Sequence, residues 1–259
     1  MANCIKINHM YGLHTQRLRN VAIHSPSIFW VKSGHKLLFW QDSELTLDSS
    51  NLLLARANQQ LTFENKPERE RFSSVQFSLH LTPPEDMLER SVSLAEHNDS
   101  PLYVPNKNIF HTLEVFAHFN WNELSHKAQE FWLLGLYQQL AEAGKLHRLF
   151  ASHTLPFAQK LSDYLIQEPG QDHQLNKVAE HFSMSRATFI RRLKKEQTQF
   201  KDILTQVRMN HALSLMQQGK RQQIDIALRC GYQSQERFSQ RFNQQFGITP
   251  KQYLKTLTE

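Results

Sequence analysis

Two stretches near the C-terminal end carry side chains at spacings that suit contact with a nucleic acid. In the first, Phe189 and Leu193 share one face of a helix expected over residues 186–197. If that face is buried, the outward residues are Arg186, Ala187, Ile190, Arg191 and Lys194. Cations suit phosphates, and the first turns of such a helix reach base edges in the major groove. Taken alone, this stretch also fits an ordinary solvated face.

The second stretch repeats the arrangement and favours the nucleic-acid interpretation. Phe238, Phe242 and Phe246 form an i, i+4, i+8 stripe that we expect to be buried. The side chains left outside are Gln235, Glu236, Arg237, Gln240 and Arg241. Glutamine and arginine make the bidentate hydrogen bonds that distinguish adenine and guanine.

The elements around these stretches predict two helix-turn-helix units, over residues 175–197 and 224–246, among seven helices in residues 155–256. Ser185 and Ser234 are placed to cap the second helix of each unit, and Gly231 to end a short helix in the left-handed conformation. We expect Leu175, Val178 and Ala179 to be buried in the first unit, and Ile224, Ala227 and Leu228 to play the same part in the second. A linking helix over residues 200–218 would be about 28 Å long. That length approaches the roughly 34 Å between successive major-groove faces, so both units could meet adjacent groove segments.

The basic charge lies in the same half of the chain. Residues 151–259 carry 16 basic and nine acidic side chains, whereas residues 1–150 carry 14 and 15. We therefore expect a near-neutral domain over residues 1–150, a linker at residues 151–154, and a basic DNA-binding domain over residues 151–259.

The first half predicts a β-rich module followed by helices, so the whole chain is expected to be α+β. Short apolar runs at residues 28–31, 37–40, 52–54 and 75–81 are separated by turn-forming residues, which suggests a small barrel or sandwich. Residues 75–81 alternate as a half-buried strand does. Residues 108–148 change to helical periodicity and predict two amphipathic helices, which could pack on the β-module or on a second copy of themselves, with the second helix capped at either Asn122 or Ser125.

Several function classes find little support. Cys4 and Cys230 are far apart, and the ten histidines of residues 1–150 follow no metal-ligand spacing, so we expect no metal, no cofactor and no enzyme. The sequence has no apolar run long enough for a membrane helix and no export signal, which predicts a cytoplasmic protein. Lys32, Lys36 and Arg56 lie in or beside expected strands and could hold an anionic ligand, although cations also protect strand edges from pairing.

Residues 224–253, IDIALRCGYQSQERFSQRFNQQFGITPKQY, resemble the signature of AraC/XylS-type bacterial transcription regulators. The signature is I-x-x-I-A-x-x-x-G-[FY]-x-S-x-x-x-F-x-x-x-F-[KR]-x-x-[FY]-G-x-[ST]-P-x-x-[YF], and the chain departs from it at Asn243. Residues 175–179 and 189–194 are similar to the family's first unit, and Arg208 with Ala212 to its linking helix. The resemblance covers residues 155–256.

The resemblance implies a cytoplasmic, nucleoid-associated activator that binds double-stranded promoter DNA and works with RNA polymerase. It also implies a cupin-like N-terminal module that responds to a small ligand or a protein partner, and dimer-forming helices, here residues 108–148. The family's base-facing positions fall on Ala187, Ile190 and Arg191 in the first unit, and on Gln235, Glu236, Arg237 and Gln240 in the second. Two alternatives are enzymes, a DNA-repair alkyltransferase with a four-cysteine zinc cluster and a cupin metalloenzyme, and this chain lacks the ligands of both.

Overall fold

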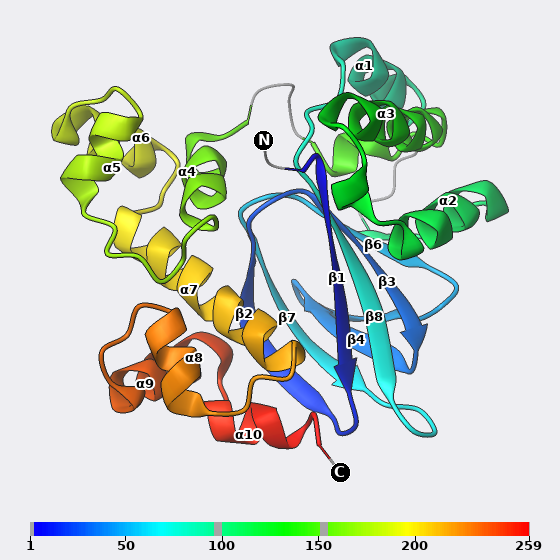
Figure 1. Ribbon diagram of the computed structural model, residues 1–259. Helices are drawn as coiled ribbons and strands as arrows, with labels where there is room; N and C mark the ends of the chain where they lie inside the picture. Colours follow the sequence, from blue (N-terminus) through cyan, green and yellow to red (C-terminus); the bar gives the residue numbers. More distant parts are fainter. Residues whose placement is uncertain (1–2, 96–99, 151–154, 259) are drawn as a thin grey trace.

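The computed structural model describes residues 3–95, 100–150 and 155–258, and the chain is an α+β protein (Figure 1). Its strands form two antiparallel sheets, with the orders β1-β8-β3-β6-β9 and β2-β7-β4-β5. The strands are β1 (Ile5–Gly12), β2 (Gln16–Ile23), β3 (Ser27–Ser33), β4 (His35–Trp40), β5 (Ser43–Leu47), β6 (Leu52–Ala55), β7 (Gln59–Lys66), β8 (Phe72–Leu79) and β9 (Leu102–Tyr103). Side chains of both sheets share one apolar core, so the expected β-rich module is confirmed. We call this module the barrel.

The five-stranded sheet is buried on both faces. In β3, Phe29 and Val31 point into the barrel, whereas Ile28 and Trp30 belong to a second core outside it. The expectation of a half-buried strand at residues 75–81 was therefore wrong. The strand ends at Leu79, and both faces of β8 are covered: Val75, Phe77 and Leu79 pack under the helices, and the face that carries Phe72 lies against the barrel core.

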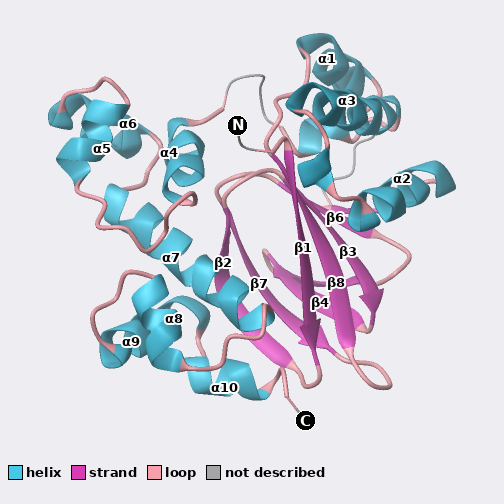
Figure 2. Cartoon of the chain, in the orientation of Figure 1, coloured by secondary structure: helices cyan, strands magenta, loops and turns pink. Residues whose placement is uncertain are grey.

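Three helices cover that outer side, as Figures 1 and 2 show at the upper right. They are α1 (Glu85–Ser93), α2 (Lys107–His118) and α3 (His126–Glu142). A short 3-10 turn η1 (Trp121–Glu123) joins α2 to α3, and a second, η2 (Leu146–Arg148), follows α3. The two predicted helices correspond to α2 and α3, and Ser125 caps α3 by accepting a hydrogen bond from the Ala128 amide. The sequence analysis did not predict α1. The Trp30 and Phe110 rings meet at 5.0 Å, which joins α2 to β3.

The C-terminal half consists of helices, and the predicted linker at residues 151–154 lies outside the described residues. The helices are α4 (Phe157–Leu165), α5 (Leu175–His181), α6 (Arg186–Lys195), α7 (Phe200–Gln217), α8 (Gln223–Arg229), α9 (Gln235–Phe246) and α10 (Pro250–Lys255). Seven helices were expected here, and those predicted over residues 186–197 and 200–218 correspond to α6 and α7 within two residues.

The long helix α7 belongs to two cores. Phe200, Ile203 and Val207 pack with α4, α5 and α6, which form the first unit. Further along, Ala212 and Met216 pack with α8, α9 and α10, which form the second unit. One rigid helix therefore carries both units.

The core of the second unit is continuous with the barrel interior, a connection that the sequence analysis did not predict. Polar contacts reinforce this packing. The Gln217 side chain accepts from the Tyr11 amide at 3.0 Å and donates to the Tyr11 carbonyl at 3.0 Å. Asn210 donates to the Ala22 carbonyl at 2.6 Å, and Gln245 to the Asn20 carbonyl at 2.6 Å. The barrel thus holds α7 and α9 in this structure.

Candidate DNA-binding surface

The first unit is built around a cluster of aromatic rings. The Phe157 ring packs edge-on against Phe182 and Phe189, with centroid distances of 5.3 and 5.2 Å. Ser185 caps α6 by accepting from the Thr188 amide, as predicted. The Glu196 carboxylate, at the end of α6, accepts from the Phe157 and Ala158 amides, both at 2.8 Å. These bonds satisfy donors at the start of α4, which has no side-chain cap of its own, and fix α6 against α4.

This packing leaves the predicted outward face of α6 in solvent. All five predicted residues are exposed, including Ile190 at 44%. In the described part of the chain, no carboxylate forms an ion pair with Arg186, Arg191 or Lys194. Their charges are therefore available to a polyanion.

The second unit places α9 in the same way. Phe238, Phe242 and Phe246 are fully buried, with successive ring centroids at 5.8 and 4.8 Å, so the predicted stripe is confirmed. Ser234 caps the helix through the Arg237 amide. Gly231 has a φ of +75°, as expected for the residue that follows a short helix. The outward residues are all exposed, and they are Gln235, Glu236, Arg237, Gln240 and Arg241.

One prediction for the second unit was wrong. Ile224 and Leu228, expected in the core, are 46% and 57% exposed, whereas Ile226 and Ala227 are fully buried. Since the short helix has only seven residues, it presents one narrow face to its partner. The pair Ile226-Ala227, not Ile224, therefore takes the place that Val178 and Ala179 hold in the first unit.

A single arginine joins the two units. The Arg208 guanidinium, from the middle of α7, donates to the Pro169 carbonyl at 3.1 Å and to the Gln171 carbonyl at 2.9 Å, in the loop after α4. Gly170 lies in that loop, and a Cβ on it would stand 2.4 Å from the Arg229 carbonyl oxygen of α8. Only glycine permits this approach. The loop and Arg208 thus fix how the two units face each other.

The three cations proposed for a ligand do not form one site. Lys32 pairs with Glu114 of α2 and lies over the Trp30 ring at 3.3 Å. Arg56 donates to the Arg148 carbonyl at 3.0 Å and to that of His147 at 3.3 Å.

Only Lys36 points into the barrel, where it is 1% exposed. Its amine donates to Asn65 and stands 3.5 Å from the centroid of the Phe63 ring. Burial lowers the pKa of Lys36 to about 7. Asn65 in turn donates to Gln16 at 2.9 Å, and Gln16 to the Thr256 hydroxyl at 3.0 Å, so a polar chain runs from the barrel interior to the end of α10.

The two thiols are buried and separate. Burial raises the pKa of Cys230 to about 12, and it also raises that of Cys4, so both are held as thiols. In the described part of the chain, no group of three histidine, cysteine, aspartate or glutamate side chains is arranged to hold a metal ion. The same residues contain no helix long and apolar enough to cross a membrane.

Comparison with known proteins agrees with this geometry. Residues 178–256 match the model of a helix-turn-helix domain family. The chain is 30% identical over 108 residues to the HTH-type transcriptional activator CfaD of Escherichia coli, and 32% identical over 108 residues to the activator CsvR of the same organism. These segments cover 42% of this chain and 41% and 40% of the two relatives, so the match spans about two fifths of each.

The solved structure of ToxT from Vibrio cholerae matches the whole fold. It covers 99% of this chain and all of its own, with a TM-score of 0.63 at 18% identity. ToxT has also been solved with an unsaturated fatty acid bound.

The fold and the two exposed helices define a tandem helix-turn-helix protein of the DNA-binding class. More particularly, residues 178–256 form a domain of the helix-turn-helix family, the part of the chain in which the sequence resembles AraC/XylS-type regulators. The relatives named above are transcriptional activators, a function that is not enzymatic, and they give no support to the two enzyme alternatives.

Proposed function

We propose that this chain is a sequence-specific transcription activator that inserts α6 and α9 into adjacent major-groove segments of promoter DNA. The observation that carries the proposal is the repeated arrangement of a buried apolar face and an exposed cationic or amide face on both helices. We assign the DNA contacts to residues 186, 187, 190, 191 and 194 in α6, and 235, 236, 237, 240 and 241 in α9.

The helices α6 and α9 differ in the side-chain groups that they present for contact with DNA bases. Exposed Ala187 and Ile190 on α6 can contact a thymine methyl group but cannot form hydrogen bonds to bases, whereas Arg191 can. The face of α9 carries two glutamines and two arginines. We therefore propose that both helices grip the phosphates and that α9 supplies most of the hydrogen-bonded base recognition.

The test begins with selection of bound sequences from random DNA by the full-length chain, followed by affinity measurements on the selected site and on random DNA. We expect Arg237→Ala to weaken binding to the selected site by about 1–3 kcal/mol, and binding to random DNA much less. Arg229→Ala is the matched control, because Arg229 is exposed on α8 and pairs with Asp225 at 2.9 Å. Equal losses on both DNAs would reassign Arg237 to phosphate contact, and failure to select any sequence would refute the proposal.

We further propose that residues 1–150 form the regulatory domain and residues 151–259 the DNA-binding domain, with activity set by a small ligand or a protein partner. Since ToxT has been solved with an unsaturated fatty acid, a carboxylate ligand is the first candidate. Lys36 would be its partner, because it is the cation inside the barrel and Asn65 already accepts from its amine. If so, oleate should bind the wild-type protein and not Lys36→Met, as measured by calorimetry.

The proposal includes two further partners, a second copy of the chain and RNA polymerase. Exposed aromatic side chains on the outer helices, Phe131 at 64% and Trp132 at 44%, support a homodimer formed through residues 108–148. In analytical sedimentation, the wild type should form a dimer and Phe131→Glu should remain a monomer, which would support this homodimer. RNA polymerase follows from the activator function, and we place the protein in the cytoplasm, on the nucleoid when bound to DNA.

A further inference from the structure

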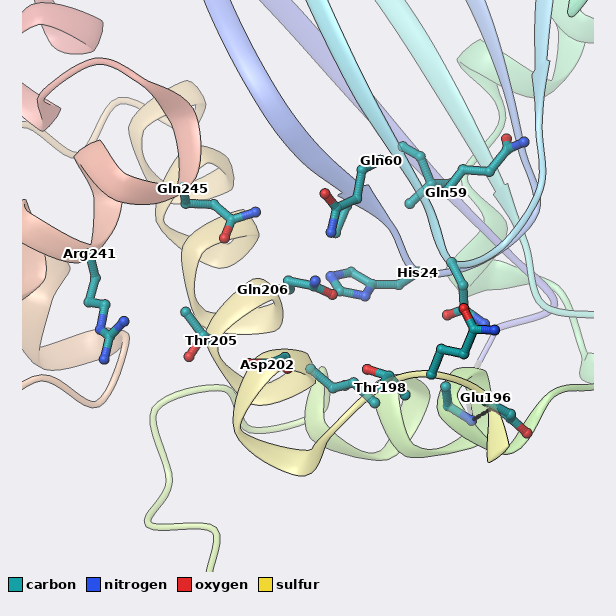
Figure 3. A pocket seen from close by; sticks show the side chains of 16 residues that line it. His24, Gln59, Gln60, Glu196, Thr198, Asp202, Thr205, Gln206, Arg241 and Gln245 are labelled. Atoms are coloured by element: carbon teal, nitrogen blue, oxygen red, sulfur yellow. Dashed lines mark hydrogen bonds between the residues drawn. The ribbon is translucent and has the colours of Figure 1, made fainter. Parts of the chain in front are cut away.

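A cavity of about 440 Å³ lies where the barrel meets both helix-turn-helix units (Figure 3). The end of β2 and the start of β7 form one wall, and the loop between α6 and α7 forms another. The remaining walls come from α7 and from α9, the proposed recognition helix of the second unit. Segments that are far apart in sequence, at residues 22–24, 58–60, 196–206 and 241–245, therefore line one space.

The lining is dominated by amides and hydroxyls. Gln59, Gln60, Gln206 and Gln245 contribute side-chain amides, and Thr198 and Thr205 contribute hydroxyls. In Figure 3, Gln60 from the barrel and Gln245 from α9 project from opposite sides of the space. Amides and hydroxyls both donate and accept hydrogen bonds, as the hydroxyl groups of a polyol do.

The lining carries one cation and two carboxylates, a net charge of −1. Asp202 on α7 and Arg241 on α9 carry opposite charges, and the Glu196 carboxylate is already engaged by the first amides of α4. Among the lining residues, the only ring is the imidazole of His24, and the apolar side chains are two alanines and two isoleucines, Ala22, Ala158, Ile23 and Ile203. This chemistry disfavours a multivalent anion, a stacked base and a lipid chain.

Unpartnered polar atoms gather at this junction. Within the described residues, four buried side-chain nitrogen or oxygen atoms lack a hydrogen-bond partner, and three of them belong to His24, Gln159 and Asn210. His24 lines the cavity, and Figure 3 shows its ring extending from the barrel towards α7. Gln159 follows lining residue Ala158 in α4, and Asn210 donates to the carbonyl of lining residue Ala22. Buried polar groups in native proteins are nearly always satisfied, and of these three atoms His24 Nε2 is the one that lies in the cavity lining, where a bound molecule could engage it.

We propose that this cavity binds a small, uncharged, multiply hydroxylated molecule of about monosaccharide size. Its hydroxyls would hydrogen-bond the amides of β7, α7 and α9, and one of them would engage Nε2 of His24. Burial lowers the pKa of His24 to about 4, so the ring that meets the ligand is neutral. The site is separate from Lys36 and differs from it in chemistry, since it lacks the apolar walls that a fatty chain needs.

If the proposed function is correct, a ligand bound in this cavity would also weaken the proposed DNA contacts of α9. Arg241 belongs both to the cavity and to the outward face of α9, and Gln245 both lines the cavity and bonds to the Asn20 carbonyl of the barrel. A ligand that bonds to both side chains would tie α9 to the barrel and draw Arg241 away from phosphate.

The test is calorimetric titration of the full-length chain, without DNA, with D-glucose, D-xylose and D-mannitol as probes. We expect at least one probe to bind, and both Gln206→Leu and Gln60→Leu to weaken it by about tenfold or more. Gln218→Leu is the matched control, because Gln218 is exposed on the last turn of the same helix as Gln206 and does not line the cavity. Gln60 is exposed on the barrel, so its variant should fold even if Gln206→Leu does not.

Absence of binding by all three probes would overturn the proposal, as would equal binding by the wild type, Gln206→Leu and Gln60→Leu. A rise in melting temperature alone counts for nothing, because sugars stabilise proteins by exclusion from their surfaces. DNA affinity is measured on the same preparations. A chain that binds DNA but no probe contradicts the cavity proposal alone, and one that binds a probe but no DNA contradicts the proposed function alone.

Discussion

Replacing one buried phenylalanine in each helix-turn-helix unit should reveal that the two units depend differently on the barrel. Phe189 and Phe242 are both fully buried in recognition helices. Phe189 lies in a core confined to the first unit, whereas Phe242 lies in the core that continues into the barrel. The same substitution, Phe→Leu, thus probes a core that is separate from the barrel in one case and a core shared with the barrel in the other.

The local cost of each substitution should be similar. Leucine removes three carbon atoms from each site and can partly refill the space, so we estimate a loss of about 1–2 kcal/mol. A loss of this size speeds the exchange of amides that depend on opening of that core by about 5–30-fold. The difference should appear in which amides respond.

Hydrogen–deuterium exchange by mass spectrometry measures this. We expect Phe242→Leu to speed exchange in α9 and also in β2 and β7, whose side chains Leu18 and Phe63 share its core. Phe189→Leu should speed exchange in α5 and α6 and leave the barrel strands unchanged. If Phe242→Leu affects only α8, α9 and α10, or if both variants affect the barrel equally, our inference of one continuous core is wrong.

Three further predictions concern the caps, the bridge between the units and the buried lysine. Glu196→Gln removes the charge that caps α4 and should lower the free energy of unfolding, measured by urea titration, by about 1 kcal/mol. This value allows for the solvent exposure of Glu196. The control Gln197→Ala, at an exposed neighbouring residue, should leave the free energy of unfolding nearly unchanged. Arg208→Leu removes the two hydrogen bonds that hold the loop after α4 against α7. It should reduce affinity for a selected site that spans both units more than for a site reduced to one half, and equal loss on both sites would show that Arg208 does not set the spacing of the units. Because burial lowers the pKa of Lys36 to about 7, the unfolded chain binds an extra proton between pH 7 and about 10.4. The free energy of unfolding of the wild type should therefore rise with pH, relative to that of Lys36→Met, by at most about 1.4 kcal/mol per pH unit across this window. If the two curves of stability against pH are parallel, the pKa of Lys36 is not lowered by burial.

Much of the DNA-binding half follows from local sequence. Hydrophobic spacing of 3.6 residues, serine caps and a left-handed glycine act within a few residues of one another, so they can be recognised without the fold. This is why α6 and α9, their buried phenylalanines and their exposed faces were all predicted correctly. The exception, Ile224 and Leu228, arose in a helix of seven residues, where several apolar side chains compete for one narrow contact.

The barrel half was predictable only in outline. Strands β1, β2 and β7 carry many polar side chains and were missed, because their pairing partners, not their own composition, make them strands. The polar face of β8 was misjudged for a similar reason. The expected apolar stripe packs under the outer helices, whereas Ser74 and Ser78 are buried on the barrel side, which cannot be read from the strand itself.

The sequence by itself thus determined that the chain carries two exposed, cationic or amide-rich helices on separate helix-turn-helix units. Tertiary structure alone decided what lies behind them. It placed Lys36 inside the barrel, joined the barrel core to the second unit, and set His24, Gln206 and Gln245 around one cavity. The physical reason is the separation along the chain between the residues that interact. Caps and helical stripes depend on neighbours in the chain, whereas burial, shared cores and cavities depend on residues brought together from more than two hundred positions apart.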